Sequence, residues 1–473
     1  MEMQLNWDLS LEKGRLSRQL AARIRQSILS GELAAGDRLP AARRIAAELK
    51  IARGTVTAAI DTLVAEGALE TRTGSGTYVA ADAAFLNIAA RKASPKITLN
   101  IKRALPTPDI DTPATDYIDL RPCRPSLERF PLQTWRRCMS KAASRAPEPD
   151  YGDPRGEDTL RREICSYLRR ARGLSASPED IIVTNGAVHA MHILSELFLD
   201  KKSKVAFENP GYPLARQTFA LSGAEIAACR VDTDGIIPGD LPKDACNVKI
   251  VYVTPSHQFP TGGRLSLGRR RALIEWAEKR SALIVEDDYD GEFRYDAPPL
   301  TPLATMAPNS VVYCGTFSKT MFPGLRLGFA VAPRPIIDAM AAYRTVSEYA
   351  PAAPNQGALA HFIAEGYYEK HVHRMRRIYA GKRKLLSALV QQHNGNATLQ
   401  GLHSGLNALI QLPQDRSAKT LSQHMEKAGV LIPPVARYDI TRKPSDNALV
   451  FGYAAPTETE ITRSVELLFA QQQ

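Results

Sequence analysis

The sequence predicts an α/β domain over residues 117–473, preceded by a small module of three helices and a β-hairpin over residues 1–80. In the larger part, short apolar runs alternate with amphipathic helical segments, which is typical of a mostly parallel sheet between helices. In the smaller part, apolar residues recur at helical spacing and a glycine-rich turn follows. Residues 81–116 show little periodicity, so we expect a linker between two domains.

The composition is that of an ordinary globular protein, with 44% hydrophobic and 23% charged residues in a chain of 473. The net charge of +11 permits an anionic partner but does not identify one. Residues 1–80 contain eleven Lys and Arg against nine Asp and Glu, a net of +2, so overall basicity says little about DNA binding. The six cysteines form no CxxC pair, no apolar run reaches the length of a membrane span, and the first residues show no signal-peptide pattern. We therefore expect a cytoplasmic protein without a metal site.

Apolar stripes predict the helices of the first module. Leu16, Leu20, Ile24 and Ile28 recur every four residues and predict one helix, which ends at Gly31. A second helix is predicted after Pro40, with Ile45, Ala46 and Leu49 facing inward. A third helix is predicted from Arg53 to Gly67, with Val56, Ile60 and Leu63 facing inward. A hairpin is predicted over residues 71–79.

Three helices and a hairpin form a winged helix, whose recognition helix enters the major groove of DNA by its N-terminal end. The residues expected at the DNA are Arg53, Thr55 and Thr57 on this helix, Arg43 with Arg44 at the start of the preceding one, and Gly74, Ser75 and Gly76 in the wing. The alternative is a small helical interaction domain with solvated arginines.

The linker is basic in its first part and proline-containing in its second. Arg91, Lys92, Lys96, Lys102 and Arg103 precede the next acid at Asp109, and prolines follow at 106, 108 and 113. It is either a plain spacer or a tether that also contacts DNA phosphates.

Five predicted strands of the large domain are each followed by chemically distinctive residues. The strands are residues 181–183, 204–207, 248–253, 283–285 and 311–314. The segments after them are Asn185–Val188, Asn209–Tyr212, Thr254–Gly262, Glu286–Tyr289 and the turn that contains Lys319. Because α/β sheets bind ligands beyond the carboxyl ends of their strands, we expect these segments to form one site.

Lys319 and Asp287 indicate the chemistry of that site. A lysine in a hydroxyl-rich turn and a carboxylate after a buried strand match the needs of pyridoxal 5'-phosphate (PLP). The lysine forms a Schiff base with the cofactor, and the acid keeps the pyridine nitrogen protonated.

Residues 16–79 resemble a GntR-type winged-helix domain in three motifs, Gly36–Pro40, Ala52–Val56 and Gly74–Val79. The resemblance implies Arg43, Arg53 and Thr55 as DNA contacts. Ala41 and Ala42 stand where this family usually has Ser or Thr, so one hydroxyl contact to phosphate is expected to be missing.

Residues 117–473 resemble the fold type I aminotransferases, and the whole chain resembles the MocR-type regulators, a GntR subgroup with an aminotransferase-like effector domain. The matching motifs are Tyr151–Gly156, Glu286–Tyr295, Thr316–Lys319 and Pro323–Arg326. The resemblance implies a mostly parallel sheet between helices, a smaller C-terminal α+β part, and a homodimer with each DNA-binding domain over the partner's effector domain.

The same resemblance implies a role for each site residue. Lys319 would carry the cofactor, Asp287 would pair with its pyridine nitrogen, Tyr289 would donate to its phenolic oxygen and Tyr212 would stack on its ring. Thr316, Ser318, Arg326 and the backbone N–H groups at Ala187 and Val188 would bind its phosphate, and Tyr151 would reach that phosphate from a partner subunit.

Three positions depart from the aminotransferase pattern. Ala187 and Val188 replace the polar residues of the usual phosphate-binding turn, so we expect weaker cofactor affinity. Val450 occupies the position of the arginine that holds a substrate carboxylate, and Leu214 that of a further arginine found in some amino-acid-sensing members. Transamination of ordinary amino acids should therefore be poor.

Two interpretations of the ligand remain open. The ligand is PLP itself, or an amine or zwitterion held by other residues, with Arg216 and Arg294 nearest in the sequence. Two functions compete as well: a PLP-dependent transcriptional regulator, and an active aminotransferase with an appended DNA-binding domain.

Overall fold

The computed structural model describes residues 16–86, 116–146, 149–243, 247–296, 300–393, 397–441 and 447–470. The chain forms two compact units, Met1–Thr107 and Pro108–Gln473. The basic and proline-containing positions of the predicted linker lie outside the described residues. The predicted boundaries at 80/81 and 116/117 therefore stay predictions.

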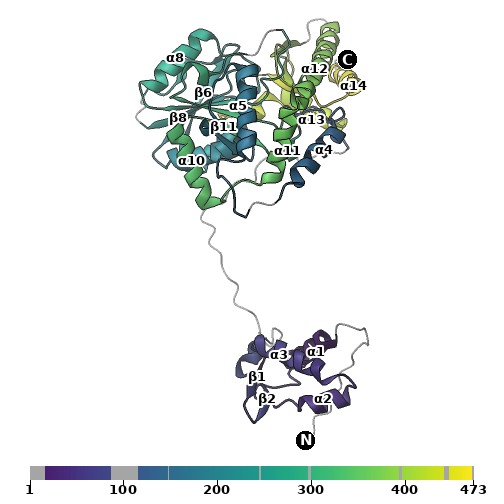
Figure 1. The fold of residues 1–473 in the computed structure, drawn as a ribbon. Coiled ribbons are helices and arrows are strands. Elements are labelled where there is room, and N and C mark those ends of the chain that lie inside the picture. Colours follow the sequence, from purple (N-terminus) through teal and green to yellow (C-terminus); the bar gives the residue numbers. More distant parts are fainter. Residues whose placement is uncertain are drawn as a thin grey trace. The chain divides into compact units, whose positions relative to one another are not determined.

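The smaller unit is a winged helix, as predicted (Figure 1). Its elements are α1 (Leu16–Ser30), α2 (Ala42–Glu48), α3 (Arg53–Ala65), β1 (Leu69–Arg72), β2 (Gly76–Val79) and the 3₁₀ helix η1 (Ala81–Leu86). The predicted inward residues, such as Ile24, Ile45 and Leu63, are fully buried. The first strand begins two residues before the predicted hairpin, and Gly74 at φ +74° forms its turn.

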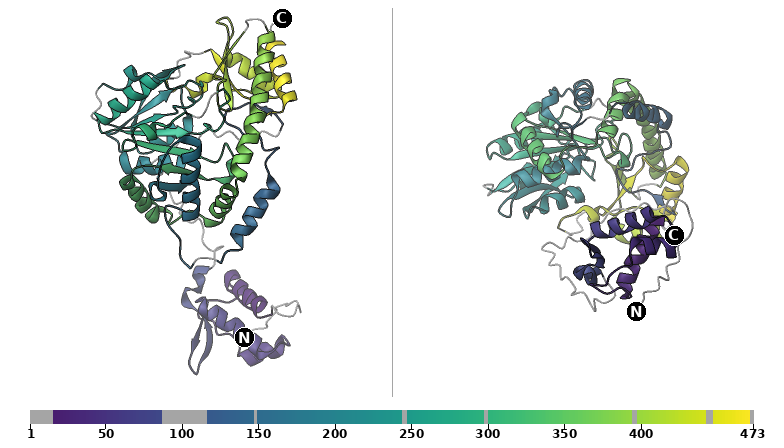
Figure 2. Two further views of the ribbon diagram at one scale, coloured as in Figure 1. Left: turned by 45° about the horizontal axis from the view of Figure 1, so that its top comes forward. Right: turned by 60° about the horizontal axis from the view of Figure 1, so that its bottom comes forward.

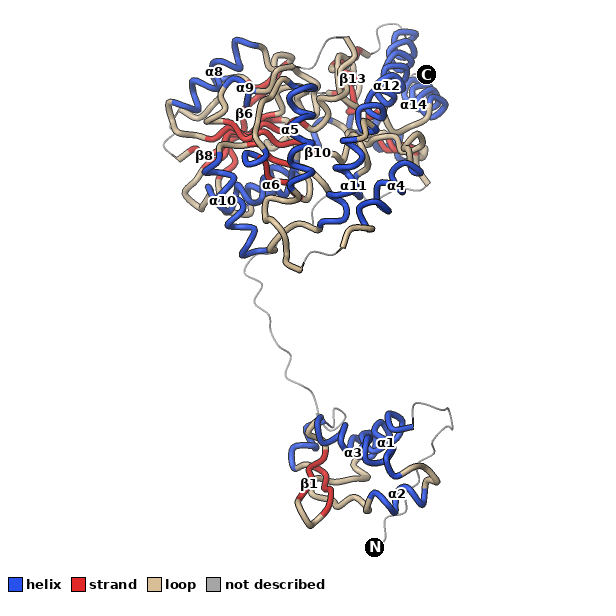
Figure 3. Tube along the Cα trace, viewed as in Figure 1, coloured by secondary structure: helices blue, strands red, loops and turns tan. Residues whose placement is uncertain are grey.

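An eight-stranded sheet is the centre of the larger unit (Figure 3). The predicted strands appear as β4 (Ile181–Thr184), β5 (Lys204–Asn209), β8 (Val248–Val253), β9 (Leu283–Asp288) and β10 (Val311–Thr316). The sequence pattern missed β6 (Glu225–Asp232), β7 (Gly235–Ile236) and β11 (Gly328–Val331). Strand β6 alternates irregularly between exposed and half-buried residues, so it forms no apolar run. Strand β11 is buried throughout, like β4, and sequence reasoning did not assign its apolar residues to a strand.

The order of strands in the sheet is β4-β11-β10-β9-β8-β5-β6-β7. Strands β10, β9, β8, β5 and β6 are parallel to one another. Strand β11 is antiparallel to both of its neighbours, β10 and β4, so β4 runs in the same direction as β10. All five predicted strands therefore end at the same edge of the sheet.

Helices cover both faces of the sheet (Figure 1). One face packs against α5 (Asp158–Arg172), α8 (Leu267–Glu278), α9 (Leu303–Met306) and α11 (Ala353–Ala364), with α4 (Leu132–Ala143) beside α11. The other face packs against α6 (Ala187–Phe198), α7 (Pro213–Ala220) and α10 (Arg334–Ser347). Each central strand is buried on both sides, which explains why it reads as a continuous apolar run.

A smaller α+β part completes the larger unit. It contains α12 (Tyr367–Gln392), α13 (Ala418–Lys427), α14 (Glu458–Ala470) and a sheet of β12 (Thr398–Gln400), β13 (Asn407–Gln411) and β15 (Ala448–Gly452) in that order. The short strand β3 (Ile118–Asp119) pairs with β14 (Val430–Leu431). Helices α12 and α14 lie side by side over this part (Figure 2). None of the helices in the described segments has the length and apolarity needed to cross a membrane.

Candidate functional site

The predicted cofactor residues lie at the edge of the sheet where the parallel strands end. Asp287 is the last residue but one of β9, and Lys319 follows β10 by three residues. The two strands are adjacent, with Asp287 opposite Cys314. Lys319 is half-buried and close enough to act electrostatically on the Asp287 carboxyl.

Asp287 is a buried carboxyl with one of its oxygens unpaired. Its side chain shares a sheet face with Tyr252, whose hydroxyl donates to Oδ2 at 2.8 Å. The other oxygen, Oδ1, has no hydrogen-bond partner among the described residues. Burial raises the pKa of Asp287 to about 7, although the Tyr252 hydrogen bond and the Lys319 charge oppose this. A protonated pyridine nitrogen would supply the donor and the charge that Oδ1 lacks, so the residues present fit PLP.

The turn before α6 and the residues after β10 approach each other closely. A Cβ atom added to Gly328 would lie 2.8 Å from the Cα atom of Gly186, so only glycine allows this contact. The Arg326 guanidinium lies over Gly186, with its Nη1 atom 3.4 Å from the position of an added Cβ, and donates to the carbonyl of Asn185. Arg326 itself has φ +53°, a strained conformation of the kind often found at binding sites.

These segments supply the groups that would hold a phosphate. Helix α6 begins at Ala187, so its first N–H groups and the positive end of its dipole lie beside the Arg326 guanidinium. Thr316 pairs with Gly328 across β10 and β11, and its hydroxyl accepts the N–H of Ser318 at 3.2 Å. The predicted phosphate-binding residues thus come from neighbouring segments, and their role stays a prediction.

The histidines of α6 have structural partners. His189 Nδ1 accepts the N–H of Asn185 at 3.1 Å, and its Nε2 lies 3.1 Å from Glu348. Burial lowers the pKa of His189 to about 4. The His192 ring lies edge-on to Tyr343. Both histidines are therefore held by contacts within the described part of the larger unit.

Tyr289 and Tyr212 both pack against Phe259. The ring centroids are 6.0 Å apart for Tyr289 and Phe259 and 5.6 Å apart for Tyr212 and Phe259, both in edge-on geometry. Tyr289 is buried, whereas Tyr212 is half-buried at the start of α7. Their predicted contacts with PLP stay predictions.

Three residues of the site were missed by sequence reasoning. Tyr252 bonds Asp287, and both His257 and Asp290 form a buried network with Tyr289. His257 lies in the segment Thr254–Gly262, which was expected to be distinctive, and Asp290 directly follows the segment Glu286–Tyr289, so their position at the strand ends was the available signal. Tyr252 lies within β8 and gave none.

An apolar wall surrounds Val450, the position at which the sequence predicts that the carboxylate-binding arginine is missing. Val450 in β15 is fully buried opposite Leu409 of β13, and its N–H donates to the carbonyl of Pro433. The wall is one apolar cluster, made by Cys123, Phe259, Tyr289, Leu409, Val435, Tyr438, Ala448 and Val450, with Tyr212 packed against it. Cys123 has φ +61°, and the charge of Lys319 opposes the rise that burial causes in the pKa of its thiol.

The two arginines considered as substitutes for the clamp lie in different surroundings. Arg216 is half-buried in α7. Arg294 is only 4% exposed, and its Nε and Nη1 atoms have no hydrogen-bond partner in the part of the chain that the structure describes. Burial lowers the pKa of Arg294, and the nearby charges of Arg264, Arg172 and Arg270 lower it further. Leu214 occupies the position of the arginine found in some amino-acid-sensing members, and it is half-buried in α7.

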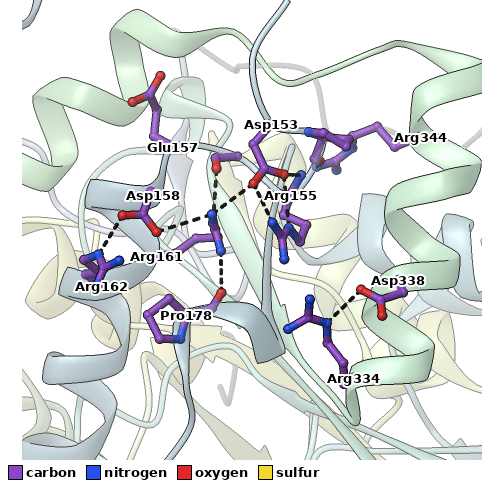
Figure 4. Close-up of polar contacts among 12 residues, drawn as sticks. Asp153, Arg155, Glu157, Asp158, Arg161, Arg162, Pro178, Arg334, Asp338 and Arg344 are labelled. Carbon is purple, nitrogen blue, oxygen red and sulfur yellow. Dashed lines mark hydrogen bonds and ion pairs between the residues drawn. The ribbon is translucent and has the colours of Figure 1, made fainter.

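Tyr151 is displayed on an anchored loop. It is 71% exposed and stacks on Tyr349 with ring centroids 4.4 Å apart. Asp153 accepts hydrogen bonds from Arg155 at 2.8 Å and from the buried Arg161 at 3.1 Å (Figure 4). Burial alone would raise the pKa of Asp153, but these bonds hold it below its usual value.

Arg161 and Arg344 hold the C-terminal half of this loop. Arg161 also donates to the carbonyls of Gly156 and Pro178, the second of which is labelled in Figure 4. Arg344 donates to the carbonyls of Pro154 and Val183. A rigid loop that presents an exposed aromatic ring suits a contact with another subunit, which is the predicted role of Tyr151.

The predicted DNA-binding residues lie on the surface of the winged helix. Arg43 and Arg53 are exposed, Thr55 is half-buried, and the exposed Thr57 donates its hydroxyl to the carbonyl of Arg53 at 3.1 Å. In the wing, Gly74 and Ser75 are exposed and Gly76 is half-buried. Sequence reasoning missed Arg38, whose guanidinium lies against Gly76.

Comparison with known proteins identifies both units. Residues 16–79 match the family model of the bacterial regulatory proteins of the gntR family, and residues 116–468 match that of the aminotransferases of class I and II. The chain is 34% identical over 447 residues to a probable rhizopine catabolism regulatory protein MocR of Rhizobium meliloti, covering 93% of this chain and 90% of that protein. The chain belongs to the MocR-type group of GntR regulators.

One further relative and one solved structure are similar to this MocR-type protein. It is 34% identical over 448 residues to the HTH-type pyridoxine biosynthesis transcriptional regulator PdxR of Corynebacterium glutamicum, covering 93% of this chain and 92% of that one. Its larger unit is similar to an archaeal alanine:glyoxylate aminotransferase, with a TM-score of 0.70 and 26% identity over 75% of this chain and 90% of that one. The predicted fold of an aminotransferase-like domain behind a winged helix is confirmed.

The buried carboxyls make the cofactor-free protein sensitive to pH. Asp287, Glu208 and Glu286 have pKa values raised to about 7 by burial, so the folded protein keeps protons that the unfolded chain releases near pH 4. Between about pH 4 and 7 the folded state therefore binds more protons, and its free energy of unfolding falls as pH rises. Asp287→Asn should raise the stability of the cofactor-free protein at pH 8 by about 1–3 kcal/mol, measured by urea unfolding.

The same substitution should weaken PLP binding, measured by equilibrium dialysis, because it removes the partner of the pyridine nitrogen. Glu286→Gln is the matched control, since Glu286 accepts the N–H groups of Leu303 and Ala304 on the opposite face of the sheet. An Asp287→Asn protein that is less stable at pH 8 and binds PLP normally would contradict this assignment.

Proposed function

We propose that this MocR-type protein is a PLP-dependent transcriptional regulator. The observation that carries the proposal is one chain with two features: a winged helix with exposed basic residues, and a lysine–aspartate pair whose clamp position is occupied by Val450. When bound, PLP would supply an electrophilic carbon for amines and an electron-accepting ring. We also propose that the protein acts in the cytoplasm, where it would bind its DNA.

In this proposal, separate groups of residues bind the cofactor and the DNA. Lys319 would hold the cofactor covalently, and Asp287 would keep the pyridine nitrogen protonated. Arg326 and the start of α6 would bind the phosphate. Arg53 and Arg43 would contact DNA, with Arg53 at the end of α3 that enters the major groove.

Either PLP or an amine serves as the signal in this proposal. The relative PdxR is named for pyridoxine biosynthesis, which favours PLP itself. The relative MocR is named for rhizopine catabolism, which favours a small organic ligand. The apolar wall around Val450 favours a ligand without a carboxylate at that position. In either case the signal acts by preferring one arrangement of the protein over another.

The proposal includes a homodimer. The exposed pair of Tyr151 and Tyr349 on an anchored loop supports a subunit contact at this place. By the resemblance, the dimer is head-to-tail, and Tyr151 reaches the phosphate of the partner subunit's cofactor.

An active aminotransferase is the second candidate, and the retained Lys319, Asp287 and Tyr289 favour it. A steady-state assay of PLP-loaded protein with a panel of amino acids and 2-oxoglutarate separates the two functions. Because no arginine stands at Val450, we expect turnover well below about 1 s⁻¹, the lower end of usual enzyme rates. Turnover at or above that rate would establish the enzyme instead.

Arg53 tests the DNA-binding half of the proposal. Arg53→Gln should weaken binding to DNA about 5- to 150-fold, the effect of losing one good phosphate or base contact. The measurement is fluorescence anisotropy with DNA fragments selected by the wild-type protein from a random pool. Arg271→Gln, which removes an exposed charge from α8, is the matched control and should bind normally. Equal affinities of Arg53→Gln and the control would contradict the assigned surface.

Lys319 tests the sensing half. Lys319→Ala should lose the visible absorption band of covalently bound PLP and lose any change in DNA affinity on adding PLP or an amine. Its DNA affinity without these ligands should stay near that of the wild-type protein, because the winged helix is a separate unit. Lys370→Ala, an exposed lysine of α12, is the control. A Lys319→Ala protein whose DNA binding still responds as in the wild type would refute the covalent anchor.

A further inference from the structure

His257 is a buried histidine whose Nδ1 atom contacts the side chains of two residues that follow one another at the end of β9. Its Nδ1 atom lies 2.9 Å from Asp290 Oδ2 and 3.0 Å from the hydroxyl oxygen of Tyr289. All three side chains are buried, with His257 only 1% exposed. A buried network of this kind has few alternative arrangements, because each polar atom must find a partner within it.

The partners of Nδ1 determine where the protons lie. A carboxylate accepts hydrogen bonds and does not donate them, so the 2.9 Å contact between Nδ1 and Asp290 Oδ2 calls for a proton on Nδ1 that points to Asp290. An Nδ1 atom that carries a proton cannot accept the proton of Tyr289. The Nδ1–H can also donate weakly to the Tyr289 oxygen. The hydroxyl proton of Tyr289 is then available to an acceptor other than His257.

We propose that His257 and Asp290 are positioning residues that direct the hydroxyl proton of Tyr289 away from the protein and toward the bound cofactor. The inference rests on the proposed function, in which the acceptor is the phenolic oxygen of PLP. His257 does not touch the cofactor in this scheme. It acts through Tyr289, which would otherwise be free to donate to the imidazole.

The opposite side of the imidazole is fixed by the backbone of the C-terminal part. Nε2 lies 3.3 Å from the carbonyl oxygen of Gly401. A Cβ atom added to Gly405 would lie 2.2 Å from His257 Cε1 and 2.5 Å from Asp290 Oδ2, so this backbone packs directly on the pair. Gly405 is held in turn, because its carbonyl accepts the hydroxyl groups of Tyr295 at 2.6 Å and Tyr453 at 2.7 Å. The ring therefore cannot rotate to present a different nitrogen to Tyr289.

The loop that carries His257 is anchored as firmly as the ring. The side chain of the next residue, Gln258, donates to the carbonyl of Pro210 at 2.9 Å and accepts from the hydroxyl of Thr261 at 2.6 Å. The other imidazole near His257 is that of His403, with ring centroids 6.0 Å apart. Burial lowers the pKa of His403 to about 4, so it stays uncharged near neutral pH and adds no charge to the network.

The test compares two amides that replace the imidazole at different points. His257→Asn places an N–H donor near the position of Nδ1 and can still bond Asp290, whereas His257→Gln places its amide near Nε2 and leaves Asp290 unpaired. Each full-length protein is loaded with PLP, and the pH at which its visible absorption band changes is measured. A donor to the phenolic oxygen stabilises the form in which that oxygen bears more negative charge, so losing it moves the change to higher pH.

His257→Gln should raise this pH by about one unit, the effect of one charge-assisted hydrogen bond, and Tyr289→Phe should do the same. His257→Asn should stay near the wild-type value. Adding His257→Gln to Tyr289→Phe should produce no further shift, because both changes remove the same interaction. Circular dichroism melts confirm that each variant folds. If His257→Gln does not fold, Asp290→Ala replaces it, since it frees Nδ1 to accept the Tyr289 proton and should give the same shift.

The outcomes separate the inference from the proposed function. A wild-type protein with no visible PLP band contradicts the proposed function and the inference with it. A normal wild-type band and a shifted Tyr289→Phe protein, with His257→Gln or Asp290→Ala unshifted, contradict the inference alone. Shifts that add up in the double variant, or equal shifts in His257→Gln and His257→Asn, also contradict it, because they indicate a general effect of losing the ring.

Discussion

The larger unit is organised around a carboxyl group that the fold buries without fully pairing it. Asp287 receives one hydrogen bond, from Tyr252, and its Oδ1 atom has no partner among the described residues. Burying an unpaired ionised carboxylate is unfavourable, so burial raises the pKa of Asp287 to about 7, and a cation beside Oδ1 would favour the ionised form. Two neighbouring parallel strands hold it there, because β8 supplies Tyr252 and β10 leads to Lys319. The site is therefore less stable empty than filled by a cationic ring, and a ligand that fills it stabilises the fold by mass action.

The apolar wall changes what such a site can recognise. Val450 lies in the middle of a hydrogen-bonded strand pair and belongs to one apolar cluster with Phe259 and Leu409, so its surroundings offer a carboxylate no charged partner. A carboxylate pressed against this wall would lose its hydration without gaining a charged partner. Cys123 adds to the wall at φ +61°, a conformation that favours glycine and that the surrounding packing must hold in place. These features support the proposal of a PLP site that does not suit ordinary amino-acid substrates.

Sequence patterns predicted the positions of the site more completely than its contacts. The five strands that lead to it are buried on both faces and form apolar runs, so their ends could be located without coordinates. Strand β6 lacks that signal. Strand β11 has it but was not recognised, and without these two strands the order of the sheet was not predicted. The partner of Asp287 lies within β8, where Tyr252 looks like any core aromatic residue. The contacts of His257 with Gly401 and Gly405 join segments about 145 residues apart along the chain. Such contacts depend on tertiary packing that no local pattern records.

The network around His257 connects the proposed ligand site with the C-terminal part of the larger unit. On one side it bonds Tyr289, which belongs to the apolar wall, and on the other it contacts the loop before β13. Strands β13 and β15 carry Leu409 and Val450 of the same wall. A ligand in this site would therefore contact both the strand ends of the large sheet and the C-terminal part. Only a ligand that binds two arrangements of these parts with different affinity can shift the balance between them, and a site built from both parts meets that requirement.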